Sequence, residues 1–180
     1  MQPRDPGRRD RIIDACLDVI ASDGVDGTSM RRVAAAAEVP LGSMTYHFTG
    51  RDELLREAFE RFATSVSDAF ERRLVAVEPG DREALVRALV DVIGLDVYPD
   101  PRDLVLTHEL YVLAARRPEF RTLTSAWMKQ SRVALERHLD PETAGLMDAV
   151  IEGATIHRAP EDQEKGRLDP EVAVRRVLGL

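Results

Sequence analysis

Residues 28–51, TSMRRVAAAAEVPLGSMTYHFTGR, decide the fold of this chain. They contain two short helical patterns separated by the break Glu38-Val39-Pro40. Apolar side chains at helical spacing mark the inward positions, which are Met30, Val33, Ala34, Ala37, Val39, Met44 and Phe48. The small alanines at 34–37 allow the two helices to approach closely. Two short helices joined by such a turn predict a helix-turn-helix, whose second helix is suited to the DNA major groove.

The second of these helices has an unusual outward face. If Met44 and Phe48 are buried, the side chains that project outward are those of Ser43, Thr45, Tyr46 and His47. Hydroxyls, a phenol and an imidazole together on so short a helix are typical of a surface that binds a partner. The alternative is that Tyr46 and His47 simply pack against the long helix that follows.

These residues resemble a known family. The run VPLGSMTYHF at 39–48, followed by RDELL at 51–55, resembles the signature of TetR-type transcriptional repressors, roughly V-S-x-G-x-L-Y-x-H-F-x-x-K-E-x-L. Upstream, GTSMRRVA at 27–34 is similar to the second helix of that family. The resemblance covers residues 10–55 and agrees beyond them only in the layout of helices. It implies a DNA-binding regulator, a repressor that a small-molecule effector releases.

The resemblance also implies roles for single residues. It places Arg31 near a base or a phosphate, and an arginine can bind guanine in bidentate fashion. Leu41, at the start of the recognition helix, would meet a thymine methyl group, although a place in the core is an equal alternative. Arg51 takes the position of the usual lysine. The DNA-contacting set that we expect is Thr28, Ser29, Arg31, Leu41, Gly42, Ser43, Thr45, Tyr46, His47 and Arg51.

Three departures from the family pattern affect the expected contacts. Pro40 replaces the common serine cap, which removes a capping oxygen from the recognition helix. Thr45 stands where tyrosine is frequent, so a contact from this position is shorter or absent. Glu38 replaces a frequent glycine and is expected to adopt a left-handed conformation, at a cost of roughly 1 kcal/mol.

The rest of the chain shows helical spacing without useful β alternation. We expect a first helix over 11–22, a long helix from Arg51 to about Val77, and further helices over 81–96, 103–117, 119–139, 141–157 and from Asp169. A turn is expected at 98–101 and a polar segment at 160–167. The predicted fold is all-α. A helix-turn-helix DNA-binding domain spans 1–50, with the start of a linking helix at 51–60, and a helical effector-binding and dimerisation domain spans 51–180.

Two sets of residues are candidates for sensing and pairing, functions that the family resemblance assigns to the C-terminal helices. A mostly apolar pocket with a few polar anchors would be lined by Thr107, His108, Tyr111, Trp127 and Ser131. Aromatic residues at this spacing fill cores more often than they contact ligands, which is the alternative. A homodimer interface with small residues would contain Leu135, Leu146, Val150, Gly153, Ala154 and His157.

Composition limits the functions that the chain can have. Its net charge of −7 argues against a protein that coats nucleic acid indiscriminately. Most of the acidity lies outside the helix-turn-helix domain of residues 1–50, which we call the head. Residues 1–50 hold 6 basic and 7 acidic side chains, whereas residues 51–180 hold 19 basic and 25 acidic ones. The longest stretch free of Asp, Glu, Lys and Arg, Val39–Gly50, has 12 residues and is too short to span a membrane. We expect a cytoplasmic protein.

No catalytic motif, cofactor motif or dense set of metal ligands is present. His108 with Glu109, or His138 with Glu142, is too sparse a set for a metal site, and Cys16 belongs to the apolar stripe of the first helix. We therefore expect no enzyme activity, no cofactor and no metal. The expected partners are a pseudo-palindromic DNA operator, a small-molecule effector and a second copy of the chain. The rival function is that of a helical dimeric small-molecule-binding protein without DNA-binding activity.

Overall fold

The computed structural model describes residues 7–96, 100–157 and 168–180, and within these ranges it contains helices and turns but no strand. The predicted all-α fold is confirmed for the described residues. The chain divides into two compact units. The first holds the described residues up to Ala63 together with Val105–Thr124, and the second holds Thr64–Leu104 together with the described part of Ser125–Leu180. The functional division near residue 50 remains a prediction.

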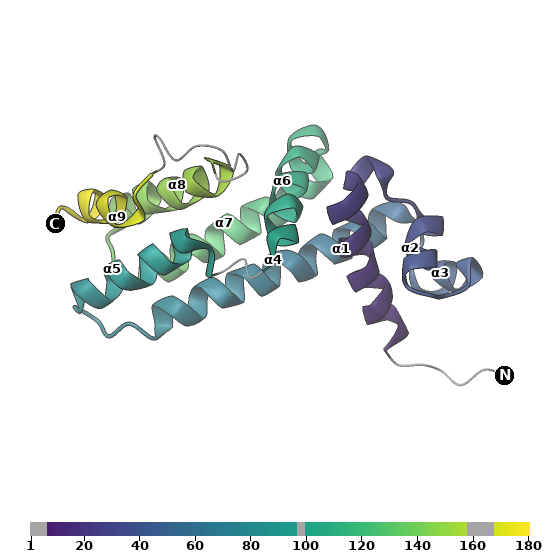
Figure 1. The fold of residues 1–180 in the computed structure, drawn as a ribbon, viewed down its shortest axis with the longest axis horizontal. Helices are drawn as coiled ribbons and strands as arrows, with labels where there is room; N and C mark the ends of the chain where they lie inside the picture. Colours follow the sequence, from purple (N-terminus) through teal and green to yellow (C-terminus); the bar gives the residue numbers. More distant parts are fainter. Residues whose placement is uncertain (1–6, 97–99, 158–167) are drawn as a thin grey trace. The chain divides into compact units, whose positions relative to one another are not determined.

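The first unit contains the predicted helix-turn-helix. It is built from α1 (Arg8–Gly27), α2 (Met30–Ala36), α3 (Leu41–His47), the first part of α4 (Arg51–Val75), most of α6 (Pro101–Arg116), the short 3₁₀ helix η2 (Pro118–Phe120) and the beginning of α7 (Arg121–Leu135). Helix α2 packs on both α1 and α3 (Figure 1). The fully buried large side chains of the first unit include Ile12, Ile20, Met44, Phe48, Leu54, Leu55, Phe59, Leu106, Leu110 and Phe120.

The second unit is a helical bundle. It contains the end of α4, α5 (Arg82–Asp91), one turn of π-helix η1 (Val92–Asp96), most of α7, α8 (Pro141–His157) and α9 (Pro170–Leu178). Helix α9 packs on α5 and α8 (Figure 1). The hydrophobic core of the second unit includes Phe70, Leu74, Leu85, Leu89, Leu135, Met147 and Val174.

Helix boundaries differ from the expected ones where a tertiary contact or a cap intervenes. Helix α1 continues past Ser22 to Gly27, with a kink at Gly24, whose φ of +70° lies in the left-handed region. Helix α7 ends at Leu135 rather than near Leu139, and a turn leads from it to the Asp140 cap of α8. Residues 98–99 of the expected turn and the polar segment 160–167 lie outside the described residues. In the described parts of the chain, no helix combines the length and the apolar character that a membrane crossing requires.

Candidate nucleic-acid interface and sensing pocket

The turn between α2 and α3 has the local geometry that its residues predict. The Ser29 hydroxyl caps α2 by accepting a hydrogen bond from the Arg32 backbone N–H at 3.3 Å. Glu38 has a φ of +53°, which confirms the expected left-handed conformation at this position. Pro40 occupies the cap position of α3 and supplies no side-chain hydrogen bond. Helix α3 therefore begins without a capping oxygen, as expected.

The outward face of α3 is exposed. Met44 and Phe48 are buried, while Tyr46 is 72% exposed and Thr45 is also exposed. Leu41 is 48% exposed, which excludes the alternative that it belongs to the core. The rings of Tyr46 and His47 meet edge to face, with their centroids 5.2 Å apart. Most of the Tyr46 side chain is thus presented to solvent.

The remaining residues of the predicted DNA-contacting set lie around this face. Gly42 is exposed, Ser43 and His47 are half-buried, and the Thr45 hydroxyl donates to the Gly42 carbonyl at 3.1 Å. Arg31 and Ser29, on the α2 side, are exposed. The exposed predicted residues therefore come from α3 and from the start of α2.

Thr28 requires a correction. Its side chain is buried and its hydroxyl donates to the Gly24 carbonyl at 2.8 Å, so the hydroxyl is not available for the expected phosphate contact. The reason is that the backbone of Gly24 is non-helical, and the Thr28 hydroxyl supplies a donor for its carbonyl. Thr28 thus closes the α1–α2 turn from within.

Arg51 has a structural role that the sequence did not indicate. Its Nε donates to the Thr28 carbonyl at 2.7 Å, and its Nη2 donates to the Val25 carbonyl. The guanidinium at the start of α4 therefore holds the α1–α2 turn in place. The expected phosphate contact of Arg51 stays a prediction, and any substitution of Arg51 also removes these two internal hydrogen bonds.

Glu109 on α6 is a site residue that sequence reasoning missed. Its carboxylate accepts a hydrogen bond from the Val25 backbone N–H at 2.8 Å, across 84 positions of the chain. A carboxylate that caps the last turn of α1 satisfies an amide that the kink leaves without a helical partner. No local sequence pattern predicts this hydrogen bond, because the two residues belong to helices that are far apart in the sequence.

A cavity of about 20 Å³ lies within the second unit among α4, η1, α7 and α8. Two of the predicted ligand-binding residues, Trp127 and Ser131, line it. Thr107, His108 and Tyr111 lie on α6 in the first unit and are not part of its lining. The lining residues are Val66, Phe70, Val92, Trp127, Ser131, Asp148, Ile151, Glu152 and Thr155. Asp148, Glu152 and Thr155 also line the cavity, and the sequence analysis did not identify them. They lie on α8, for which only the apolar positions were considered.

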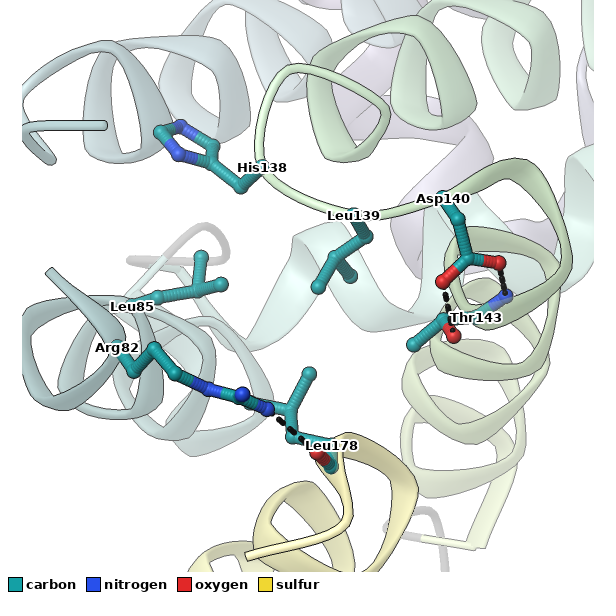
Figure 2. A pocket seen from close by; sticks show the side chains of 7 residues that line it. All are labelled: Arg82, Leu85, His138, Leu139, Asp140, Thr143 and Leu178. Carbon is teal, nitrogen blue, oxygen red and sulfur yellow. Dashed lines mark hydrogen bonds between the residues drawn. The ribbon is translucent and has the colours of Figure 1, made fainter. Parts of the chain in front are cut away.

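A second cavity, of about 270 Å³, opens among α5, the α7–α8 turn and α9 (Figure 2). The polar groups that line it already have internal partners. Arg82 Nη2 donates to the Leu178 carbonyl at 2.7 Å, and the Asp140 carboxylate accepts from the Thr143 hydroxyl at 2.7 Å (Figure 2). The ring of His138 is hydrogen-bonded to the Leu74 carbonyl at 2.9 Å. These contacts join the ends of the helices, and none of the predicted ligand-binding residues lines this cavity.

The predicted interface residues divide into buried and accessible ones. Leu135 and Ala154 are buried in the core of the second unit, so they are not available to a second copy, and their assignment to the interface was wrong. A regular apolar stripe does not by itself distinguish a core face from an interface face. Leu146 is 55% exposed and His157 is exposed, while Val150 and Gly153 are half-buried.

Two groups near the helix-turn-helix, the Cys16 thiol and the Asp52 carboxylate, have shifted pKa values. Burial raises the pKa of the Cys16 thiol to about 12, an effect that the nearby Arg51 charge partly opposes. The hydrogen bonds from Arg117 lower the pKa of Asp52. Over the ranges that the structure describes, no group of three or more His, Cys, Asp or Glu side chains could hold a metal ion.

Two family models match the chain. The model of the bacterial regulatory proteins of the tetR family matches residues 12–58, and that of the tetracyclin repressor-like C-terminal domain matches residues 80–180. The nicotine-responsive transcriptional repressor HdnoR of Paenarthrobacter nicotinovorans is 28% identical over 127 residues, which are 68% of this chain and 64% of that protein. The chain thus spans less than two thirds of the length of this curated relative.

Solved structures match over nearly the whole chain. SCO7518 of Streptomyces coelicolor A3(2), a candidate transcriptional regulator, has a TM-score of 0.85 and 49% identity, covering 96% of this chain and 98% of that one. The multidrug binding protein EbrR, in complex with ethidium, has a TM-score of 0.77 and 35% identity, covering 98% of this chain and 99% of that one.

Proposed function

Because the chain belongs to the tetR family of bacterial regulatory proteins, we propose that it is a sequence-specific DNA-binding regulator of transcription, a repressor that a small-molecule ligand releases from its operator. The observation that carries the proposal is the exposed face of α3. Tyr46 is 72% exposed on a helix whose Met44 and Phe48 are buried, so the helix is anchored on one side and presents its polar side outward. On this proposal the protein acts in the cytoplasm.

The proposed contacts divide by role. Ser43, Tyr46 and His47 on α3 would bind phosphate oxygens and set the register, while Arg31 and Leu41 would reach base edges. A homodimer would place two such heads on half-sites about 34 Å apart, or a multiple of that distance, on a pseudo-palindromic operator. The exposed Leu146 and His157 on α8 are the accessible residues through which we expect the copies to pair.

The proposed release works through α4. Val66 and Phe70 on this helix line the cavity of the second unit, and Arg51 at its start holds the α1–α2 turn. A ligand that displaces α4 therefore also acts on the residue that positions the head. Such a ligand shifts the equilibrium only by the difference in its affinity for the DNA-competent and DNA-incompetent arrangements. HdnoR is named a nicotine-responsive repressor and EbrR a multidrug binding protein, which supports a small-molecule effector here.

Selection of binding sites from random duplex DNA tests the proposed function. We expect a two-fold symmetric consensus. If the purified protein enriches no sequence at moderate salt, the rival function, a dimeric small-molecule-binding protein without DNA-binding activity, replaces this one.

Variants in the head give the residue-level test. Tyr46→Ala, which removes a proposed phosphate contact, should weaken binding to all DNA sequences. Arg31→Ala, which removes a proposed base contact, should cost about 1–3 kcal/mol on the preferred site and relax the sequence preference at one position. Arg72→Ala, which removes an exposed arginine from the other end of α4, is the matched control and should leave the affinity and the sequence preference unchanged. Arg51→Ala is less informative because it also breaks the hydrogen bonds to the α1–α2 turn.

A further inference from the structure

The larger cavity of the second unit, of about 270 Å³, has opposite charges on two sides. Arg82 reaches it from α5, and Asp140 reaches it from the turn between α7 and α8. Figure 2 shows the Arg82 guanidinium on one side and the Asp140 carboxylate on the other, with Leu139 between them. Leu85 and Leu178 extend the apolar part of the lining. The cavity therefore has a cationic side, an anionic side and aliphatic surface between the two.

The positive charge of Arg82 is not neutralised by an ion pair within the described residues. Its Nη2 donates to the Leu178 carbonyl at 2.7 Å, which uses one of the about five N–H donors of a guanidinium. Arg175 on α9 differs, because it forms ion pairs with Glu83 at 2.8 Å and with Glu171 at 2.9 Å. Arg82 thus has both the charge and the donors to bind a carboxylate from outside the chain.

Asp140 is charged and keeps part of its capacity to accept hydrogen bonds. One of its oxygens accepts from the backbone N–H groups of Glu142 and Thr143, and the other accepts from the Thr143 hydroxyl at 2.7 Å. The hydrogen bonds from the Thr143 backbone and hydroxyl lower the pKa of Asp140, so the side chain is a carboxylate at neutral pH. A carboxylate offers about four lone-pair sites. The remaining site suits a cationic donor.

We propose that this cavity binds small aliphatic zwitterions, in which a methylene chain separates an ammonium group from a carboxylate. The carboxylate of the ligand binds Arg82, its ammonium group binds Asp140, and its methylene chain lies on the leucines between them. A singly charged ligand gains only one of these contacts and also meets a like charge, since Asp140 repels an anion and Arg82 repels a cation. A volume of about 270 Å³ equals that of roughly nine water molecules, which suits a ligand of this size.

This site goes beyond the proposed function. It shares no lining residue with the smaller cavity that contains Trp127 and Ser131, and none of its lining residues belongs to the head. Binding here therefore does not depend on whether the smaller cavity is a sensing site, and selection of DNA sites can succeed or fail independently of it.

Isothermal titration calorimetry on the full-length protein without DNA tests the proposal. The zwitterionic probes are γ-aminobutyrate, δ-aminovalerate and ε-aminocaproate, which differ only in the separation of their charges. The singly charged analogues are hexanoate and hexylamine. At least one zwitterion should bind about fivefold or more tightly than either analogue, which is the ratio that one exposed ion pair supports, and added salt should reduce this preference. If no zwitterion exceeds both analogues, the proposal is wrong.

Substitutions that remove one charge assign the preference to named groups. Arg82→Gln should abolish the preference for the zwitterion over hexylamine, whereas Arg82→Lys should keep part of it. Asp140→Asn should abolish the preference over hexanoate and should tighten the binding of hexanoate itself, because the repulsion is gone. Arg87→Gln and Glu142→Gln remove exposed charges from α5 and α8 that do not line the cavity, so they are the matched controls and should bind like the wild type.

The two substitutions also provide a safeguard against misfolding. Asparagine keeps a capping oxygen at the start of α8, so Asp140→Asn should fold like the wild type. If circular dichroism shows that Arg82→Gln has lost structure because the Leu178 carbonyl lacks its donor, Asp140→Asn decides. A folded Asp140→Asn protein that still prefers the zwitterion to hexanoate contradicts the proposal.

Discussion

Cys16 illustrates how burial controls chemistry at the scale of one residue. Its side chain is fully buried on α1, and burial raises the pKa of the thiol to about 12. Because the thiolate is the reactive form, the native thiol should resist Ellman's reagent at pH 8, and it should react at once after unfolding in guanidinium chloride. Rapid reaction of the native protein at pH 8 would show that the helix opens there.

The same thiol makes stability depend on pH. The unfolded thiol ionises above about pH 8.5, while the folded thiol keeps its proton until about pH 12. The unfolded state therefore loses protons first, and the contribution of Cys16 to the free energy of unfolding falls as the pH rises through this window. Denaturant melts should show that the stability difference between the wild type and Cys16→Ala shrinks from pH 8 to pH 10. A constant difference would contradict the shifted pKa.

Gly24 is the residue at which backbone conformation decides the course of α1. Its φ of +70° disfavours any side chain, and an added Cβ would lie 3.2 Å from a Glu109 carboxylate oxygen. We expect Gly24→Ala to lower the free energy of unfolding by about 1–2 kcal/mol, measured by urea denaturation. Gly42→Ala, where a Cβ meets open space within α3, is the control and should be neutral or slightly stabilising.

At the scale of elements, the hydrogen bond from Val25 to Glu109 links two helices that lie far apart in the sequence. The carboxylate caps the last turn of α1 next to Thr28, which closes the turn that leads to α2. Glu109→Ala should leave the Val25 amide without its acceptor and reduce stability by about 1–3 kcal/mol. It should also weaken operator binding, because the start of α2 loses its support.

The conservative variant tests whether the hydrogen bond to Val25, and not the charge of Glu109, is responsible for both effects. Glu109→Gln keeps an acceptor oxygen and should restore most of the stability and most of the DNA affinity, measured by thermal melts and by fluorescence anisotropy. If Glu109→Ala binds DNA like the wild type, the hydrogen bond stabilises the fold without positioning the head.

At the scale of the whole molecule, the exposure of two leucines distinguishes a residue expected at the dimer interface from a residue of the core. Leu146 is 55% exposed, whereas Leu135 on α7 is fully buried. Leu146→Arg should therefore produce a folded monomer in sedimentation experiments, while Leu135→Arg should unfold the second unit because it buries an uncompensated charge. The monomeric variant should also bind a full operator much more weakly, since binding of the second head is no longer intramolecular. A dimeric Leu146→Arg protein would place the interface elsewhere.

Local sequence was sufficient wherever the deciding interaction lies within one or two helical turns. The Ser29 cap, the left-handed Glu38, the missing cap at Pro40, and the division of α3 into buried Met44 and exposed Tyr46 all follow from spacing and residue type. These features depend on the backbone conformation that each residue type prefers and on the helical spacing of apolar side chains. Both can be deduced from the order of the residues.

Local sequence does not record which residues from distant helices meet, because these contacts arise when the helices pack. Packing gave Arg51 and Glu109 their places at the α1–α2 turn, buried Leu135 and Ala154 in a core, and set Asp148 beside Trp127 in the cavity. An apolar or acidic position on a helix carries no record of the surface that it faces, because the same stripe serves a core, a pocket or a second copy. Residue order accounts for the helices and for the exposed face of α3, whereas packing between helices accounts for what supports that face and for what lines the cavity.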